Sequence, residues 1–349
     1  MALTPDTLSD LTETGFDTVI DVRSPAEFAE DHLPRAINLP VLSNDERAQV
    51  GTIYKQDSPF RARKIGAALV ARNAAAHLEG PLADKPGGWR PLVYCWRGGQ
   101  RSGSFAAILT QVGWRAETVT GGYRAWRRMV VRALYDDPWP GRLVLLDGNT
   151  GTAKTEILAR LASRGVQVID LEALACHRGS LFGGVATPQP SQKAFESAIA
   201  CALAGFDPAR PVVVEAESSK VGDLLVPPSL WSAMRAAPRL VIAAPRAARA
   251  RYLTRAYGDL GEDPGRVSDT LARLAPYHGH VQIEAWQAMA ANGEAEALAD
   301  SLMAVHYDPR YGRARGGVAV AAKFRAERLD EGDIDKVAGQ VEAWISAID

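Results

Sequence analysis

Short apolar runs alternate with longer helix-like segments along the chain, and the runs form two series. The first series occupies residues 16–23, 36–40, 92–94 and 117–119. Helical patterns lie between these runs, including one at 62–78. Buried strands that alternate with helices are typical of a parallel sheet with helices on both faces. The pattern therefore predicts an α/β domain in the N-terminal part of the chain.

The second series begins after residues 136–141, a stretch of acidic residues, proline and glycine that we interpret as a linker. Its apolar runs lie at 143–146, 167–171, 211–215 and 240–244. Helical patterns separate these runs, and the chain from Arg246 onward is predicted to be mostly helical. A chain of 349 residues is long enough for two domains that each bury a core. We therefore predict α/β domains at 1–135 and 141–349, the second with a helical C-terminal region.

The composition is that of an ordinary globular protein, with 47% hydrophobic and 23% charged residues and a formal net charge of −1. No overall basic charge attracts nucleic acid or an anionic membrane, so an RNA partner would need local basic patches. The three cysteines, Cys95, Cys176 and Cys201, are too widely spaced for a disulfide framework or a zinc cluster. Residues 1–10 lack the pattern of a signal peptide, and no apolar stretch reaches the roughly 18 residues of a membrane span. These features predict a cytoplasmic protein without membrane contact.

Cys95 ends the apolar run 91–94 and opens a glycine-rich loop, Cys95-Trp96-Arg97-Gly98-Gly99-Gln100-Arg101-Ser102, that leads into a helical pattern. Backbone N–H groups in a strand–loop–helix turn favour anions and lower the pKa of a thiol. Arg97 and Arg101 add charge that does not titrate at neutral pH. We predict that Cys95 and Arg101 are catalytic, and that an anion binds to Arg97, Gly98, Gly99 and Arg101. The alternative is a buried structural cysteine beside an ordinary turn.

A second glycine-rich loop, Gly148-Asn149-Thr150-Gly151-Thr152-Ala153-Lys154-Thr155, follows the apolar run 143–146 and precedes a helical pattern. It matches the phosphate-binding P-loop except that Ala153 replaces the last glycine, at a position where the backbone approaches the ligand closely. The loop therefore predicts phosphate binding more firmly than nucleotide hydrolysis. The predicted phosphate-binding residues of this loop are Gly148, Gly151, Thr152, Lys154 and Thr155.

Two further residues are predicted to join the phosphate site. Glu215 ends an apolar run, where an acidic residue would hold Mg²⁺ through water, and the alternative is a structural salt bridge; Asp170 is a weaker candidate of the same kind. Arg178 lies in a loop-like stretch and would contact a diphosphate or another phosphate-bearing ligand, between which the sequence does not decide. His177 beside it is either a general acid or a structural histidine, and Cys176 is predicted to be buried and inert.

Several motifs of the first domain resemble the opening of a rhodanese domain. They are Asp21-Val22-Arg23, Glu27-Phe28, His32-Leu33-Pro34 and Ala36-Ile37-Asn38-Leu39-Pro40. In a rhodanese the persulfide-forming cysteine falls where this chain has Cys95. The resemblance implies that Asp21 and Arg23 brace the sheet and loop and that His32 is structural. Arg35 stands where the family usually carries glycine, which predicts a slightly altered turn.

A rhodanese-like parallel sheet followed by a P-loop NTPase-like parallel sheet resembles the tRNA 2-selenouridine synthase family. The motifs at 51–56, 94–102, 177–183 and 189–192 carry the same resemblance, which covers nearly the whole chain and weakens after about Leu253. Two residues depart from the family pattern: Ala153 in the P-loop, and Ala216 where relatives more often carry an acidic residue. Both departures lie in the phosphate-binding half.

The resemblance implies a two-step reaction on a tRNA that carries 2-thiouridine at the wobble position. A geranyl group from geranyl diphosphate first alkylates the sulfur, and selenium from selenophosphate then replaces the geranylated sulfur. No tightly bound cofactor is expected, while the P-loop allows Mg²⁺; the metal ligands are unknown from the sequence. The family also allows a transient contact with a selenophosphate synthetase. The apolar site for the geranyl chain is not located by the sequence, and Leu181, Phe182 and the helical C-terminal region are candidates.

Two other classes of function are compatible with parts of the chain. The spacing of Cys95 and Arg101 is also used by cysteine-dependent phosphatases, although these usually have histidine where this chain has Tyr94. A non-catalytic domain that only docks RNA is the third interpretation. Trp96 or Trp126 would stack on an extruded base, with core packing as the alternative. Three basic clusters are candidates for phosphate contacts: Arg61, Arg63 and Lys64; Arg124, Arg127 and Arg128; and Arg310, Arg313 and Arg315.

Overall fold

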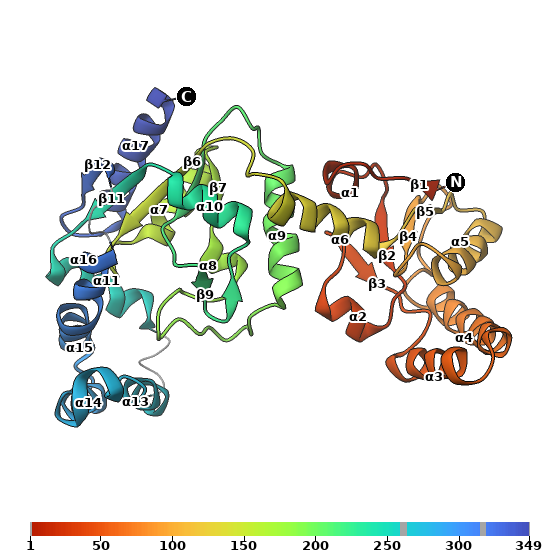
Figure 1. The fold of residues 1–349 in the computed structure, drawn as a ribbon, viewed down its shortest axis with the longest axis horizontal. Coiled ribbons are helices and arrows are strands. Elements are labelled where there is room, and N and C mark those ends of the chain that lie inside the picture. Colours follow the sequence, from red (N-terminus) through yellow and green to blue (C-terminus); the bar gives the residue numbers. More distant parts are fainter. Residues whose placement is uncertain (1, 259–263, 315–318, 349) are drawn as a thin grey trace. The chain divides into compact units, whose positions relative to one another are not determined.

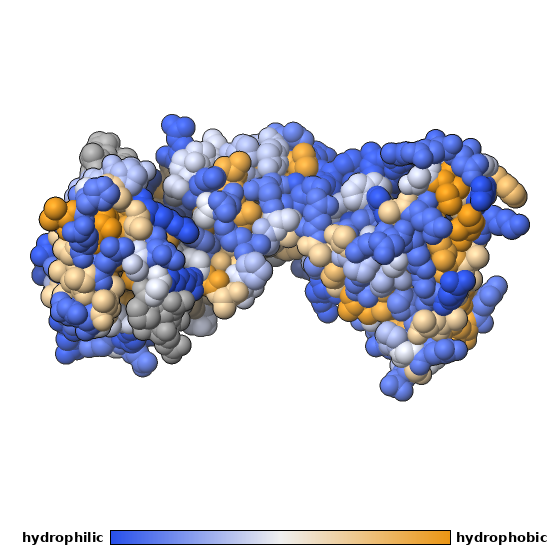
Figure 2. All heavy atoms as spheres, turned by 90° about the horizontal axis from the view of Figure 1, so that it is seen from below, coloured by the Kyte–Doolittle hydropathy of each residue, from blue (hydrophilic) through white to orange (hydrophobic). Residues whose placement is uncertain are grey.

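The computed structural model describes residues 2–258, 264–314 and 319–348. The chain forms two compact units (Figure 1). The first unit comprises Met1–Pro138 together with Pro190–Gly205, and the second comprises Trp139–Gln189 and Phe206–Asp349. Each unit is built around a parallel five-stranded sheet, which confirms the predicted α/β class. The face drawn in Figure 2 is mostly hydrophilic, with hydrophobic side chains gathered in several areas.

The sheet of the first unit has the order β1-β5-β4-β2-β3, and every neighbouring pair in it is parallel. Its strands are β1 (Ala2–Leu3), β2 (Thr18–Asp21), β3 (Ala36–Asn38), β4 (Pro91–Tyr94) and β5 (Glu117–Val119). The four predicted strands are confirmed, and β1 is an additional short edge strand. Within Met1–Pro138 the helices are α1 (Ser9–Thr12), α2 (Pro25–Glu30), α3 (Asn44–Gln56), α4 (Pro59–Glu79), α5 (Gln100–Val112) and α6 (Tyr123–Val131), followed by the π-helix η1 (Arg132–Asp136).

The core of the first unit brings α4 and α5 onto one face of the sheet. Val70 of α4, Phe105 of α5 and Val93 of β4 belong to the same buried cluster. Cys95 belongs to it too, because alternate residues of an extended strand point to the same face and Cys95 comes two residues after Val93. Cys95 therefore packs against the hydrophobic core of the first unit.

Helix α9 (Gln192–Ala204) is part of the first unit, although residues 190–205 lie within the predicted second domain, 141–349. Its buried residues include Phe195 and Ile199, and it packs beside α6. Trp126 of α6 donates a hydrogen bond from Nε1 to Ser197 Oγ at 3.1 Å. Along the sequence, the chain therefore leaves the first unit at Pro138, forms the P-loop in the second unit, and returns to the first unit with α9, whose apolar face is buried there.

The sheet of the second unit has the order β12-β11-β6-β8-β7, and all of its pairs are parallel. Its strands are β6 (Leu143–Gly148), β7 (Gln167–Ile169), β8 (Val212–Glu215), β11 (Arg239–Ala243) and β12 (Val320–Arg325), and β9 (Lys220–Val221) pairs with β10 (Leu224–Leu225) in a separate hairpin. The C-terminal region is mainly helical as predicted, but it also supplies β12, which the sequence did not predict. The central position of β6 brings its carboxyl end beside those of β8 and β11, where open α/β sheets bind ligands.

The helices of the second unit form two groups. Helices α7 (Lys154–Ser163) and α17 (Glu331–Ile348) pack with the sheet in one core, where α11 (Arg246–Ala256) also contributes Ala248 and Tyr252. Helices α13 (Pro264–Ala272), α14 (Ala275–Ala291) and α15 (Ala295–Leu302) surround a separate small core that contains Trp286 (Figure 1). The remaining helical segments are α8 (Leu171–Leu174), α10 (Pro228–Ala236), η2 (Met303–Tyr307) and α16 (Asp308–Ala314). Among the described residues, none of the helices combines the length and the hydrophobicity that crossing a bilayer requires.

Candidate functional sites

The Cys95 thiol lies at the carboxyl end of β4, directly before the loop that leads into α5. Ser102, in the first turn of α5, donates a hydrogen bond from Oγ to Cys95 Sγ at 3.2 Å. Burial by itself would raise the pKa of the Cys95 thiol, but hydrogen bonds from Ser102, the charge of Arg101 and the Arg97 N–H outweigh burial and lower this pKa below its ordinary value. The site therefore makes the thiolate, the nucleophilic form of cysteine, easier to form than it is for an ordinary cysteine.

The loop after Cys95 is packed against a second glycine turn that precedes α6. Tyr123 N–H donates to the Cys95 carbonyl at 2.9 Å, and Arg124 N–H donates to the Trp96 carbonyl at 3.1 Å. Gly122 has φ 56°, and a Cβ atom there would lie 2.2 Å from the Cys95 carbonyl oxygen. Gly98 has φ 67°, and its Cβ would lie 2.4 Å from the Val119 carbonyl oxygen. Neither position accepts a side chain, so the shape of the loop depends on both glycines.

Arg101 is held by a carboxylate in this structure. Its Nη1 lies 2.9 Å from Glu27 Oε2, and its Nη2 lies 3.4 Å from Glu27 Oε1. Burial would raise the pKa of Glu27, but the hydrogen bonds and charge of Arg101 lower it. Glu27 also closes the capping box at the start of α2 with Ser24. Glu27, to which no role was assigned from the sequence, therefore holds in place the Arg101 guanidinium that is predicted to bind an anion. Arg97, the other arginine of the loop, is exposed.

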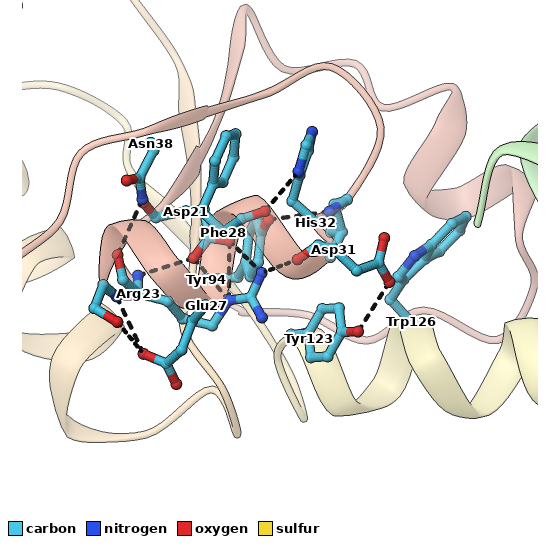
Figure 3. Close-up of polar contacts among 12 residues, drawn as sticks. Asp21, Arg23, Glu27, Phe28, Asp31, His32, Asn38, Tyr94, Tyr123 and Trp126 are labelled. Carbon is cyan, nitrogen blue, oxygen red and sulfur yellow. Dashed lines mark hydrogen bonds and ion pairs between the residues drawn. The ribbon is translucent and has the colours of Figure 1, made fainter. Parts of the chain in front are cut away.

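A buried ion pair supports the loop from the neighbouring strand (Figure 3). Arg23 Nη2 lies 2.5 Å from Asp21 Oδ2, and the same nitrogen donates to the Asp31 carbonyl at 2.6 Å. The Arg23 guanidinium lies 4.0 Å from the centre of the Tyr123 ring. Burial would lower the pKa of Arg23, but hydrogen bonding to Asp21 and its charge raise it, so the arginine stays charged. These contacts correspond to the bracing role that the rhodanese resemblance implies.

The other residues of the rhodanese-like motifs have structural contacts. His32 Nδ1 lies 3.0 Å from the Phe28 carbonyl oxygen, and the two rings stack at 3.9 Å. Arg35 adopts φ 60°, the left-handed conformation that glycine adopts without strain, so this residue keeps a glycine-like backbone where the sequence predicted a slightly altered turn. The phenol oxygen of the fully buried Tyr94 accepts a hydrogen bond from the Leu33 N–H at 3.0 Å.

The P-loop connects β6 to α7 and has a strained residue at its departure from the motif. Ala153 is buried and adopts φ 58°, so its Cβ is held in the left-handed region that the motif's glycine would occupy freely. Thr152 Oγ1 donates to the Asn149 carbonyl at 2.8 Å, and Lys154 Nζ donates to the Gly148 carbonyl at 3.1 Å. Burial would lower the pKa of Lys154, but Tyr311 and the nearby carboxylates raise it, which keeps the ammonium charged.

Three glutamates surround the P-loop lysine. Glu172, at the start of α8, accepts a hydrogen bond from Thr155 Oγ1 at 3.3 Å, and its N–H donates to Glu215 Oε1 at 2.8 Å. Burial and then the charge of Glu172 raise the pKa of Glu217 to about 8, and the protonated Glu217 hydrogen-bonds to Glu172. Burial, followed by the charge of Asp170, raises the pKa of Glu215 well above its ordinary value, and its Oε2 is buried without a hydrogen-bond partner.

Glu172 and Glu217 were missed by the sequence analysis. Each lies close after a strand, Glu172 three residues after β7 and Glu217 two residues after β8. Because these strands are neighbours in a parallel sheet, their carboxyl ends meet at one edge. The position of each glutamate just after a predicted strand was the signal from which both could have been found, since nothing in the local sequence of either residue marks it.

A pocket of about 400 Å³ contains most of the residues predicted to bind phosphate. Its walls include Gly151, Thr152, Lys154, Thr155, Arg178 and Glu215, together with Glu172 and Glu217. Gly148 is not one of the wall residues, but its carbonyl accepts the hydrogen bond from Lys154. The structure therefore brings cationic, hydroxyl and carboxylate groups to one opening at the end of the sheet.

The loop after α8 forms one wall of this pocket. His177 Nδ1 accepts a hydrogen bond from the Gly179 N–H at 3.1 Å, and burial lowers the pKa of His177, so the imidazole is neutral. Of the two interpretations of His177, general acid or structural histidine, this arrangement fits the structural histidine. The Arg178 guanidinium lies 4.7 Å from the centre of the Tyr257 ring. Cys176, predicted to be buried, is only partly buried and lies in the pocket wall.

The oxygen-rich part of the pocket suits Mg²⁺, which prefers carboxylate, hydroxyl and phosphate oxygens. Thr155, Glu172 and Glu215 share the pocket, and the unpartnered Oε2 of Glu215 has unused capacity to accept a hydrogen bond from a metal-bound water. Within the described part of the chain, no three His, Cys, Asp or Glu side chains form a ready-made metal cluster. A metal ion here would therefore depend on substrate oxygens for much of its coordination.

The residues predicted to contact RNA differ in whether the structure leaves them exposed. Trp126 is fully buried and donates a hydrogen bond to Ser197, so of its two interpretations core packing is confirmed and stacking on a base is excluded. Arg127 forms an ion pair with Glu196 of α9, which removes it from the second basic cluster. Arg61, Arg63 and Lys64 are exposed on α4, beside Phe60, whose side chain is 70% exposed. Arg310 contacts His306, while Arg315 and the side chain of Arg313 lie outside the described residues.

Comparison with known proteins identifies both units. Residues 4–129 match the rhodanese-like domain, and residues 141–264 match the tRNA 2-selenouridine synthase AAA domain. A tRNA 2-selenouridine synthase of Hahella chejuensis is 40% identical over 236 residues, which are 64% of this chain but only 59% of that protein.

Two relatives extend over almost the full length. The tRNA 2-selenouridine synthase of Cupriavidus pinatubonensis is 32% identical, and the match covers 89% of this chain and 92% of that protein. The corresponding protein of Aeromonas salmonicida is 34% identical, and the match covers 92% of this chain and 94% of that protein. With two matching domains in the same order and relatives of this extent, the chain belongs to the tRNA 2-selenouridine synthase family.

Proposed function

We propose that this protein converts wobble-position 2-thiouridine in tRNA into 2-selenouridine, through an S-geranylated intermediate. One observation supports the proposal most directly: the same chain carries a buried thiol with a lowered pKa and, in its other unit, a P-loop pocket with a charged lysine. The two sites suit two different chemical steps on one nucleoside. The substrates are the modified tRNA, geranyl diphosphate and selenophosphate, and a cytoplasmic location remains part of the prediction.

In the first step the sulfur of 2-thiouridine attacks C1 of geranyl diphosphate. A carbon–sulfur bond forms, the carbon–oxygen bond breaks, and diphosphate leaves with the electron pair while the base loses one proton. Backbone N–H groups of the P-loop, the Lys154 ammonium and Arg178 stabilise the charge on the leaving diphosphate. In this proposal the proton is accepted by the Glu172 carboxylate, to which the protonated Glu217 hydrogen-bonds. Mg²⁺ held by Thr155 and Glu215 would neutralise part of the same charge.

In the second step selenium replaces the geranylated sulfur at C2 of the base. Water attacks the phosphorus of selenophosphate, so that a phosphorus–oxygen bond forms, the phosphorus–selenium bond breaks and phosphate leaves; the selenium forms a bond to C2 of the base, and the carbon–sulfur bond at C2 breaks as geranyl thiolate departs. This route needs no oxidant, whereas a perselenide on Cys95 would require selenium to be oxidised. We therefore propose that the Cys95 thiolate activates selenophosphate directly, with Arg97, Arg101 and the loop N–H groups as its anion-binding partners. Selenophosphate would be delivered by transient contact with a selenophosphate synthetase.

The two steps can be separated by substitution. Cys95→Ala should abolish selenium incorporation and accumulate geranylated tRNA, while Lys154→Ala should leave the tRNA thiolated. Mass spectrometry of nucleosides from tRNA, treated with each purified variant and both donors, measures both products. Cys201→Ala is the matched control, because burial raises the pKa of the Cys201 thiol to about 12 and makes it a poor nucleophile.

Two results would contradict this assignment. Normal selenouridine formation by Cys95→Ala would exclude the thiol from the second step, and geranylated tRNA from Lys154→Ala would exclude the P-loop from the first. Hydrolysis of a generic phosphomonoester that disappears with Cys95 would instead support the phosphatase interpretation.

A further inference from the structure

We infer that an apolar cavity beside the P-loop pocket holds the hydrocarbon chain of the prenyl diphosphate, and that small residues of α14 and α15 set the chain length it accepts. This inference rests on the function proposed above, in which the P-loop pocket binds the diphosphate. The cavity has a volume of about 360 Å³. An apolar protein cavity of roughly 150 Å³ already accommodates a benzene molecule, so this one is large enough for a longer hydrocarbon.

The cavity and the P-loop pocket adjoin. Five residues line both: Thr150, Ser180, Leu253, Tyr257 and Tyr307. Tyr257 marks the boundary, because its hydroxyl hydrogen-bonds Ser180 Oγ at 3.2 Å while Arg178 lies across its ring. A ligand that extends from Lys154 past this boundary therefore passes from cationic to hydrocarbon surroundings. That order of environments matches a diphosphate head followed by an isoprenoid tail.

The walls of the cavity are mostly apolar. Phe182 contributes from the loop after α8, Val267 from α13, and Leu298, Leu302 and Met303 from α15 and η2. Val267, Leu298 and Leu302 also belong to the small core around Trp286, so these side chains form the wall of the cavity on one side and the core of the helical group on the other. Helices α13–α15 lie together at one end of the second unit, and hydrophobic side chains show among hydrophilic ones there in Figure 2.

Small residues line another part of the cavity. They are Ala290 in α14, Gly293 in the following turn, and Ala295 and Ala299 in α15. A larger side chain at one of them would occupy volume that a bound chain needs. Ala299 is partly buried, whereas Ala297 on the same helix is exposed and does not line the cavity. This pair gives a matched test at nearly the same position in α15.

The first measurement needs no variant. Titration calorimetry with geranyl diphosphate, dimethylallyl diphosphate and inorganic diphosphate compares the same head group with a long tail, a short tail and no tail. Burying the ten-carbon chain should make geranyl diphosphate bind at least about tenfold more tightly than inorganic diphosphate. Equal affinities for these two ligands would overturn the inference.

The second measurement uses Ala299→Phe and, as a milder change, Ala299→Leu, with Ala297→Phe and Ala297→Leu as controls. Both changes at Ala299 should weaken geranyl diphosphate about tenfold, leave inorganic diphosphate within about twofold, and affect the shorter dimethylallyl chain less. The controls should bind all three ligands like the unmodified protein. Equal losses at Ala299 and Ala297 would contradict the assigned cavity.

Failure of the proposed function has a different signature. If the protein binds geranyl diphosphate through its tail but transfers no prenyl group to thiolated tRNA, the cavity assignment stands and the proposed reaction is wrong. If transfer occurs and Ala299→Phe leaves both affinity and the preferred chain length unchanged, the reaction stands and the cavity assignment is wrong.

Discussion

The Cys95 loop and the P-loop have the same local architecture, a strand that passes through a glycine-rich turn into a helix, but they create opposite electrostatic conditions. In the first loop, hydrogen bonds and Arg101 overcome burial and lower the pKa of the Cys95 thiol. Around the second loop, burial dominates and raises the pKa of Glu217 to about 8. The backbone turn attracts anions in both cases, so the neighbouring side chains decide which protonation states each site stabilises.

The two loops also differ in how they form their left-handed positions. The first loop and its supporting turn use glycine at Gly98, Gly121 and Gly122, whereas the P-loop places Ala153 at φ 58°. Gly122 has no space for a side chain, while Ala153 already carries one. Position 122 should therefore tolerate substitution far less than position 153, although Gly148 and Gly151 of the P-loop are as closely packed as Gly98 and Gly122.

Gly122→Ala should have the largest effect, because its Cβ would meet the Cys95 carbonyl oxygen at 2.2 Å and its φ is 56°. We expect a loss of about 3 kcal/mol or more in the free energy of unfolding of the first unit, together with a loss of thiolate reactivity. Chemical denaturation and the rate of thiol alkylation measure the two effects. Gly103→Ala, in α5 with open space around its Cβ, is the control, and an equally mild result for both would contradict the packing argument.

Glu217→Gln should change how the P-loop pocket responds to pH. As the pH rises through about 8, Glu217 ionises beside the bound diphosphate, so the affinity of the unmodified protein for diphosphate should fall by on the order of tenfold. The variant has no such ionisation and should lack that additional fall. Calorimetry with inorganic diphosphate between pH 7 and about 9 checks this, and comparing the two proteins removes the titration of the ligand itself.

The same substitution should alter stability with the sign fixed by proton binding. Between the ordinary glutamate pKa of 4.5 and the raised value of about 8, the folded protein holds a proton that the unfolded chain has lost. Stability therefore decreases as the pH rises through this window, and Glu217→Gln should reduce the decrease. Parallel curves for both proteins would mean that Glu217 is ionised throughout.

Ala153→Gly should have the smallest effect and the opposite sign. Relief of the left-handed alanine should increase the free energy of unfolding by about 0.5–1 kcal/mol, after the entropic cost of glycine. Ala162→Gly, at an exposed position of α7, should decrease it by about 1 kcal/mol and serves as the control. Thermal unfolding of the two variants distinguishes strain relief from a general response to glycine, and equal destabilisation by both would show that Ala153 is not strained.

The elements that could be predicted from sequence are those with a local signal. Both loops combine an apolar strand, closely spaced glycines and a following helix, so their positions needed no knowledge of the rest of the chain. Identification of the tRNA 2-selenouridine synthase family depended on such motifs and their order, and the comparisons confirm it.

The features that escaped prediction depend on contacts between distant segments. Glu172 and Glu217 meet only because β7 and β8 are neighbours in the sheet. The amphipathic pattern of α9 predicts a helix but does not say which surface covers it. Strand β12 has a partly exposed, mixed sequence that becomes a strand through pairing with β11. Glu27 could be predicted to cap a helix, but its contact with Arg101 joins residues 74 positions apart.

Helix α9 has a consequence for how this protein can be divided. Because residues 190–205 complete the first unit, a fragment that stops at Pro138 would expose the face of α6 that α9 covers. The Trp126 indole would lose its acceptor, Ser197, and Asp31 would lose one of its two hydroxyl donors. The unit that contains Cys95 is therefore not encoded by one continuous segment. To exchange it between relatives, or to express it alone, α9 must be included, although its sequence lies between two segments of the second unit.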